Sequence, residues 1–159
     1  MKLTLLTDYA LRTLIFVGTK QGELSTIGEI AAAFDISKTH LMKVVHKLGQ
    51  CGYLENIRGK NGGIRLRRRP EEIGIGDVVR AIEEDLAVIG CMTDERFCRI
   101  QSTCVLQGAL HEATRAFLAA LDAYNLADLL APRAQLAQVL GLLHPSGFVL
   151  SGRRPGLPS

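Results

Sequence analysis

The stretch TIGEIAAAFDISKTHLMKVVHKLGQCGYLENIRGKNGGIRLRRR, residues 26–69, predicts two helices followed by a hairpin. Thr26 and Glu29 have the spacing of a capping box, which satisfies free backbone amides at the start of a helix. After a short turn, Ser37 is a suitable N-cap for a second helix. One face of each helix carries apolar residues at helical spacing: Ile27, Ile30, Ala31 and Phe34 in the first, and Leu41, Val44, Val45 and Leu48 in the second.

The second half of this stretch has the pattern of a β-hairpin. Two extended runs, YLENI and IRLRRR, flank the glycine-rich sequence RGKNGG at residues 58–63. Pro70, which has no backbone N–H to donate, ends the hairpin. Two helices joined by a tight turn and followed by a basic hairpin are the elements of a winged helix-turn-helix. We therefore predict a mainly α-helical chain with a winged helix-turn-helix DNA-binding domain over residues 1–80.

The predicted recognition helix runs from Ser37 to Gln50, and the hairpin is the predicted wing. The first turns of this helix offer polar and basic side chains to a groove and its flanking phosphates. At the wing tip, glycines allow close backbone approach and the cations favour a narrow minor groove. The predicted DNA contacts are Ser37, Lys38, Thr39, His40, Lys43, Arg58, Gly59, Lys60, Asn61, Gly62, Gly63 and Arg65.

The charge distribution favours contact with a polyanion in the first half of the chain. Residues 1–80 carry 13 Lys and Arg against 8 Asp and Glu, a net charge of +5, whereas residues 81–159 carry 6 against 8, a net charge of −2. A plainer interpretation stays open, because Asn-Gly is also common in solvated hairpin turns. The ordered combination of helices, turn and basic hairpin favours binding to double-stranded DNA.

Helical spacing of apolar residues predicts further helices on both sides of this stretch. One spans Thr7 to about Gly18, and another about Gly76 to Glu84. A long helix from Cys104 to Tyr124 has an alanine-rich face, which we expect to pack on its symmetry mate in a homodimer; burial within one chain is the alternative. The last helix, Leu126 to Leu143, is interrupted near Pro132. The predicted segments are the DNA-binding domain 1–80, a helix end and cysteine-containing loop 81–103, helices 104–143, and a disordered Gly-, Pro- and Ser-rich tail 144–159.

The overall composition limits the class of protein. With 159 residues, 47% hydrophobic and 22% charged, the chain has the composition of a soluble globular protein. No apolar run approaches the roughly 18 residues needed to span a bilayer, so no membrane partner is expected. The N-terminus lacks the pattern of a signal peptide, and we therefore expect a cytoplasmic protein with reduced thiols. No nucleophile–base arrangement, paired-carboxylate site or nucleotide loop stands out, so an enzyme is not expected.

The sequence CMTDERFCRIQSTC, residues 91–104, places three cysteines in one short polar stretch. Their odd number and the expected reduced thiols argue against a disulfide, and the polar residues between them argue against buried, inert cysteines. Structural zinc usually has closer cysteine pairs and four ligands, for which Cys51 and His111 are the remaining candidates. An iron–sulfur cluster suits thiolates and wider spacing. The spacing alone favours a cluster only modestly over zinc.

Four segments together resemble a known family: TDYALR at residues 7–12, IRGKNGGIRL at 57–66, IGIGDVVRAIE at 73–83, and the three cysteines. In this order, over about residues 1–130, they resemble the NsrR-like nitric-oxide-sensing repressors. These are a branch of the winged-helix iron–sulfur regulators that also include IscR. The IscR-like members carry a histidine ligand three residues after the last cysteine, where this chain has Gln107. This departure argues against the IscR branch.

The resemblance implies one iron–sulfur cluster per subunit, either 4Fe–4S or 2Fe–2S. The ligands that it implies are Cys91, Cys98 and Cys104 from one chain and Asp8 of the partner subunit. Without the resemblance, Asp8 is interpreted as an acidic residue in a first helical turn, with Arg12 four residues later as its ion-pair partner.

The function implied by the resemblance is a transcriptional repressor that binds a palindromic operator as a homodimer. Nitric oxide is the implied signal, and loss of DNA binding is expected to switch on genes that detoxify nitric oxide. Two alternatives stay open. One is a regulator of the same fold that responds to another signal, such as cluster status or a metabolite, and the other is a cluster carrier that does not bind DNA.

Overall fold

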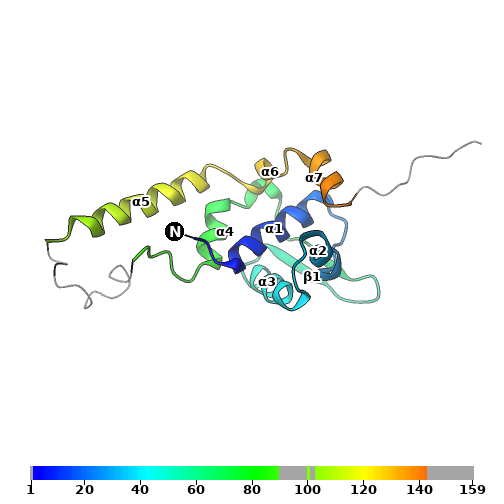
Figure 1. Ribbon diagram of the computed structural model, residues 1–159. Helices are drawn as coiled ribbons and strands as arrows, with labels where there is room; N and C mark the ends of the chain where they lie inside the picture. Colours follow the sequence, from blue (N-terminus) through cyan, green and yellow to red (C-terminus); the bar gives the residue numbers. More distant parts are fainter. Residues whose placement is uncertain (1, 90–99, 101–102, 143–159) are drawn as a thin grey trace, which may run out of the picture.

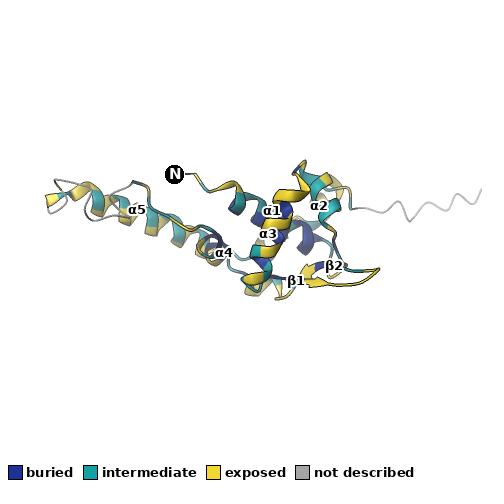
Figure 2. Ribbon diagram, turned by 90° about the horizontal axis from the view of Figure 1, so that it is seen from below, coloured by how far each residue is buried: buried dark blue, intermediate teal, exposed yellow. Residues whose placement is uncertain are grey.

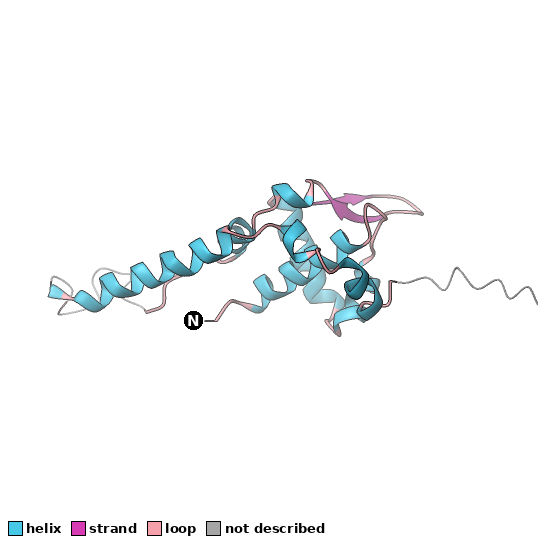
Figure 3. Cartoon of the chain, turned by 90° about the horizontal axis from the view of Figure 1, so that it is seen from above, coloured by secondary structure: helices cyan, strands magenta, loops and turns pink. Residues whose placement is uncertain are grey.

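The computed structural model describes residues 2–89, 100 and 103–142. Helices α1 to α4, α6 and α7 form one body with the hairpin, and α5 projects from this body as an arm (Figures 1 and 3). Cys91, Cys98 and the predicted tail 144–159 lie outside the described residues. The elements in chain order are α1 (Leu5–Thr19), α2 (Ile27–Phe34), α3 (Lys38–Gln50), β1 (Leu54–Ile57), β2 (Gly63–Leu66), the 3-10 turn η1 (Pro70–Glu72), α4 (Ile75–Ile82), α5 (Val105–Asp122), α6 (Leu126–Leu129) and α7 (Arg133–Val139).

The predicted capping box at the start of α2 is formed. The Thr26 hydroxyl accepts a hydrogen bond from the Glu29 backbone amide at 3.1 Å, and the Glu29 carboxylate accepts one from the Thr26 amide at 2.7 Å. Burial alone would raise the pKa of Glu29, but hydrogen bonds from Lys20 and Thr26 outweigh burial and lower it. Ser37 caps α3 by accepting a hydrogen bond from the His40 amide at 3.3 Å. Local signals in the sequence therefore set the start of both helices.

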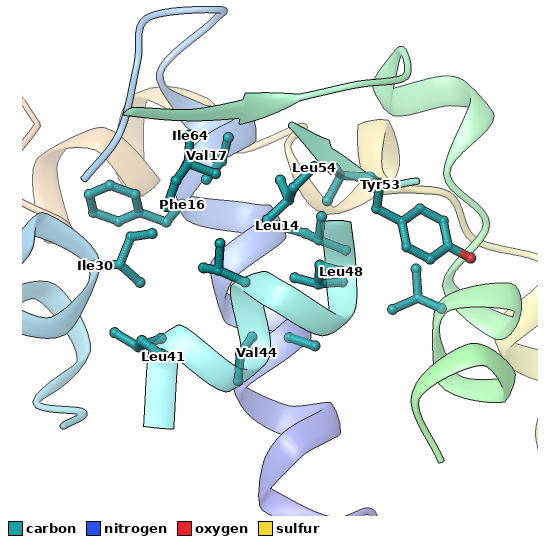
Figure 4. Packing of buried hydrophobic residues seen from close by; sticks show 14 of the residues in the cluster. Leu14, Phe16, Val17, Ile30, Leu41, Val44, Leu48, Tyr53, Leu54 and Ile64 are labelled. Atoms are coloured by element: carbon teal, nitrogen blue, oxygen red, sulfur yellow. The ribbon is translucent and has the colours of Figure 1, made fainter. Parts of the chain in front are cut away.

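A mostly aliphatic core holds α1, α2, α3 and the hairpin together (Figure 4). Phe16 belongs to this core, and the partly buried Phe34 packs against it edge to face, with the two ring centroids 6.3 Å apart. Burying one large aliphatic side chain contributes about 1.5–3 kcal/mol, so each of these helices has a strong reason to keep its apolar face inward. The labelled members of the core are Leu14, Phe16, Val17, Ile30, Leu41, Val44, Leu48, Tyr53, Leu54 and Ile64.

The hairpin is antiparallel, and one residue outside it pairs with β2. Within it, Ile57 of β1 pairs with Gly63 of β2. Ser25, in the connection between α1 and α2, exchanges two backbone hydrogen bonds with Ile64, of 2.9 and 2.7 Å. The hairpin is therefore attached to the helix pair by backbone pairing as well as by the core.

Two glycines shape the hairpin turn. Gly59 has a φ of 116°, in the region that favours glycine. A Cβ atom on Gly62 would lie only 2.2 Å from the carbonyl oxygen of Ile57, so a side chain at this position would force the turn to open.

The boundaries of the other predicted helices agree to within two residues, with one exception. Helix α1 begins two residues before the predicted Thr7, because the Thr4 hydroxyl caps it by accepting from the Thr7 amide at 3.3 Å. The predicted final helix, interrupted near Pro132, is the pair of short helices α6 and α7, and α7 ends at Val139 rather than at Leu143. Leu126 of α6 is fully buried in the core of the body.

No residue of helix α5 is fully buried, although the helix contacts α4. Figure 2 shows only exposed and intermediate residues along it. Val105 is 84% exposed and Leu106 is 60% exposed, although both are apolar. The alternative that α5 is buried within one chain is therefore wrong. Among the described residues, no helix combines the length and the hydropathy needed to cross a membrane.

Candidate functional site

Helix α3 has one buried face and one exposed face. The buried face carries Leu41, Val44, Val45 and Leu48, which belong to the core, and the opposite face is directed to solvent. All predicted DNA contacts on this helix and its cap are exposed, and the helix lies along the face seen in Figure 2, with the hairpin beside it. These residues are Ser37, Lys38, Thr39, His40 and Lys43.

The start of α1 contacts the exposed half of α3. The rings of Tyr9 and His40 lie 6.4 Å apart. Between the two helices is a small cavity of about 120 Å³, and His40 and Lys43 contribute to its lining. The other lining residues are Leu5, Leu6, Tyr9 and Val44. A displacement of the first turns of α1 would therefore change the contacts of the predicted recognition helix directly.

Among the described residues, no carboxylate pairs with the cations of the hairpin tip. Arg58 and Lys60 are exposed, and neither forms an ion pair within the described part of the chain. Arg65, which the sequence also predicts as a DNA contact, instead forms an ion pair with Glu55 across the two strands. This pairing follows from the strand register, in which Glu55 and Arg65 are direct partners. The tip is thus better suited than Arg65 to bind phosphate.

The two described members of the predicted cluster site lie on different elements. Asp8 is in the first turn of α1, where its carboxylate accepts a hydrogen bond from the Arg12 guanidinium at 2.9 Å. Cys104 is the residue before α5, and its thiol is free and partly accessible. In Figure 1 the start of α5 lies at the far end of the arm, away from the start of α1. One chain therefore does not bring its own Asp8 to its own Cys104.

The other possible ligands are also dispersed. No group of three His, Cys, Asp or Glu that could hold a metal ion occurs among the residues that the structure describes, which exclude Cys91 and Cys98. Cys51 lies at the end of α3, with its sulfur 3.9 Å from the carbonyl oxygen of Ala81. His111 is exposed on α5.

The comparisons with known proteins identify the family. The family model of Rrf2, described as an iron-dependent transcriptional regulator, matches residues 3–132. The chain belongs to the Rrf2 family. Among curated relatives, it is 54% identical over 142 residues to the HTH-type transcriptional regulator NsrR of Geobacillus kaustophilus and 49% identical over 142 residues to that of Bacillus subtilis. Both alignments cover 88% of this chain and 97% of the relative.

Solved structures of other proteins share the fold. The oxidised form of Staphylococcus aureus CymR matches with a TM-score of 0.65 and 27% identity, over 82% of this chain and 97% of CymR. The IscR of T. potens matches with a TM-score of 0.68 and 24% identity, over 87% of this chain and 91% of IscR. These matches confirm the predicted winged-helix fold, and the family confirms a DNA-binding transcriptional regulator.

Several contacts of this Rrf2-family chain are not predictable from sequence pattern. Thr4 donates to the Glu83 carboxylate through its amide, at 2.7 Å, and through its hydroxyl, at 3.1 Å. These bonds tie the start of α1 to the end of α4. Arg80 of α4 forms an ion pair with Asp122 of α5 through two hydrogen bonds. Each pair joins residues that are distant in sequence, so no local spacing signals it.

Proposed function

We propose that this Rrf2-family protein is a homodimeric repressor whose iron–sulfur cluster senses nitric oxide. The observation that carries the proposal is the combination of three closely spaced cysteines with Asp8 in a chain 54% identical to a regulator named NsrR. Nitric oxide is the proposed signal because these segments resemble those of nitric-oxide-sensing repressors. Its expected consequence is that genes for nitric oxide detoxification are repressed until the signal arrives.

The proposed cluster ligands are Cys91, Cys98 and Cys104 of one subunit and Asp8 of the partner subunit. Three thiolates and a carboxylate are a donor set that suits iron. Two observations support a ligand from the partner: Cys104 is partly accessible, and the start of α5, which follows Cys104, lies apart from the start of α1, which carries Asp8 (Figure 1). When bound, the cluster supplies iron that binds nitric oxide strongly. The carboxylate is the hardest donor of the set, so its link to iron is the one most easily broken.

The residues of α1 connect this link to DNA binding. While Asp8 is held by the neighbouring subunit, the first turns of α1 are fixed, and through Tyr9 they support His40 on α3. When that hold is lost, Arg12 is available as an alternative partner, at 2.9 Å in the single chain. Two recognition helices must lie about 34 Å apart to read one palindrome. A preference of a few kcal/mol for one geometry is enough to change occupancy more than tenfold.

The proposed dimer forms through α5. An isolated amphipathic arm with exposed Val105 and Leu106 would leave apolar surface in water. Packing two such arms on each other removes that surface and places the two winged helices on either side of a two-fold axis.

The test uses protein purified without oxygen. We expect a brown protein with visible absorbance, with iron and sulfide in equal amounts, and with tight binding to a duplex that the loaded protein itself selects from random sequences. Addition of nitric oxide should abolish the gel shift. The Cys104→Ala variant is the control: it should be paler, and its DNA binding should not respond to nitric oxide. A colourless, zinc-containing protein, or a gel shift unchanged by nitric oxide, would refute the proposal.

A further inference from the structure

The arm and the winged-helix body meet at a joint between α4 and α5. Figures 1 and 3 show that the C-terminal end of α5 is the end that reaches the body. There the Arg80 guanidinium donates two hydrogen bonds to the Asp122 carboxylate, Nη1 to Oδ1 at 2.7 Å and Nη2 to Oδ2 at 2.6 Å. A guanidinium and a carboxylate joined by two parallel bonds have a fixed mutual orientation. The pair therefore restrains the angle as well as the distance between the helices.

The backbone around the joint is built for this close approach. A Cβ atom on Gly76 would lie 1.9 Å from Oδ1 of Asp122, so the carboxylate occupies space that only glycine leaves free. Just beyond α5, the Ile75 amide donates to the Tyr124 carbonyl at 3.0 Å, and the Leu126 amide donates to the Ile73 carbonyl at 2.9 Å. The end of α5 is thus held on the segment that begins α4.

Stability alone does not explain the ion pair. The side chains of Arg80 and Asp122 are 39% and 45% exposed, and ion pairs in solvent contribute little to the free energy of folding. Hydrogen bonding to Arg80 lowers the pKa of Asp122, which favours the ionised carboxylate. What the pair provides is a defined direction for the arm.

We propose that Arg80 and Asp122 are positioning residues that set the spacing between the two recognition helices of the dimer. The inference rests on the proposed function, in which α5 forms the dimer. An arm of 18 residues is about 27 Å long at 1.5 Å per residue, so a rotation of about 10° at the joint displaces the far end by about 5 Å. One base-pair step is about 3.4 Å. A loose joint would therefore let the protein accept half-sites at more than one separation.

The experiment compares DNA spacings with the loaded, full-length protein. The probes are the duplex that the wild-type protein selects, the same duplex with one or two base pairs added or removed between the half-sites, and a single half-site. The wild type should bind the altered spacings about tenfold or more weakly. In Asp122→Asn this ratio should fall to about threefold or less, with half-site binding unchanged. Asp77→Asn is the matched control, because Asp77 also faces Arg80, at 3.4 Å, but lies on α4 itself.

The outcomes separate this inference from the proposed function. If Asp122→Asn keeps the wild-type ratio, or if Asp77→Asn loses it equally, the positioning role is wrong while the dimeric repressor stands. If the wild type itself shows no preference among spacings, paired recognition through the α5 dimer is wrong, and the inference falls with it. Sedimentation and thermal melting check folding. Should Asp122→Asn fold poorly, Arg80→Lys keeps the charge but loses the two-bond geometry, and it should give an intermediate ratio.

Discussion

Arg58 and Arg65 are two cations of the same hairpin with different surroundings. Arg58 is exposed at the tip without an ion-pair partner among the described residues, whereas Arg65 is paired with Glu55 across the strands. A cation with no protein partner is free to replace a counterion of the DNA backbone. The sequence predicted both as DNA contacts because it shows charge, but it does not show which carboxylate the strand register places opposite.

This difference gives a measurable contrast in salt dependence. Arg58→Ala should lower the slope of log K against log salt by about 0.9, as expected for one lost phosphate contact. Arg65→Ala should change the slope less, because Glu55 already compensates its charge. Fluorescence anisotropy over a salt series measures both slopes. Equal reductions in the two variants would show that Arg65 leaves Glu55 to contact DNA.

The capping box of α2 predicts a pH-dependent contribution to stability. Thr26→Ala should lower the free energy of unfolding by about 1 kcal/mol at pH 7. Because the pKa of Glu29 is lowered in the folded state, its contribution is complete above its ordinary value of 4.5 and is lost as the pH falls through the lowered pKa. Glu29→Gln should therefore destabilise the protein at pH 7 and have a shrinking effect in acid.

Urea unfolding at a series of pH values from neutral to strongly acidic measures this prediction. Glu23→Gln is the control, since Glu23 is exposed and lies outside the capping box. A constant difference between Glu29→Gln and the wild type at every pH would mean that the carboxylate of Glu29 is not what stabilises the helix start.

Elements with local signals were predictable, and elements with distant partners were not. Thr26, Ser37 and the apolar stripes define α2 and α3 within a few residues, so the recognition helix and its exposed face followed from sequence. Ser25 joins the hairpin by pairing with Ile64, 39 positions later, and a single extended residue has no pattern of its own. The early start of α1 was missed because Thr4, its cap, precedes the first clear helical repeat.

The assembly of the molecule predicts that the arm is needed for dimerisation. Leu106→Lys places a charge on the exposed apolar surface of α5, and we expect the variant to sediment as a monomer and to bind the selected duplex at least tenfold more weakly. Val139→Lys is the matched control, because Val139 is also apolar and 84% exposed but lies on α7. A dimeric Leu106→Lys variant would show that the subunits associate through another surface.

The sequence revealed the parts of the site but not how they meet. The cysteines form a pattern because they are close together, whereas Asp8 precedes them by more than 80 residues and emerged only through the resemblance. The structure adds that the starts of α1 and α5, which carry Asp8 and Cys104, lie apart in one chain (Figure 1). Likewise, the direction of α5 depends on Arg80 and Asp122, which are 42 positions apart. Contacts between distant residues, or between chains, leave no local spacing to detect.

A mixed dimer tests most directly whether the cluster joins two subunits. One subunit carries Asp8→Ala with all its cysteines, and the other carries Cys104→Ala with Asp8 intact. If the carboxylate ligand comes from the partner, one complete site remains in this heterodimer. The measurement is its visible and circular dichroism spectrum under exclusion of oxygen, with the Asp8→Ala homodimer as reference. We predict one cluster with the wild-type spectrum and the wild-type response to nitric oxide; a spectrum and response identical to those of the Asp8→Ala homodimer would contradict a shared site.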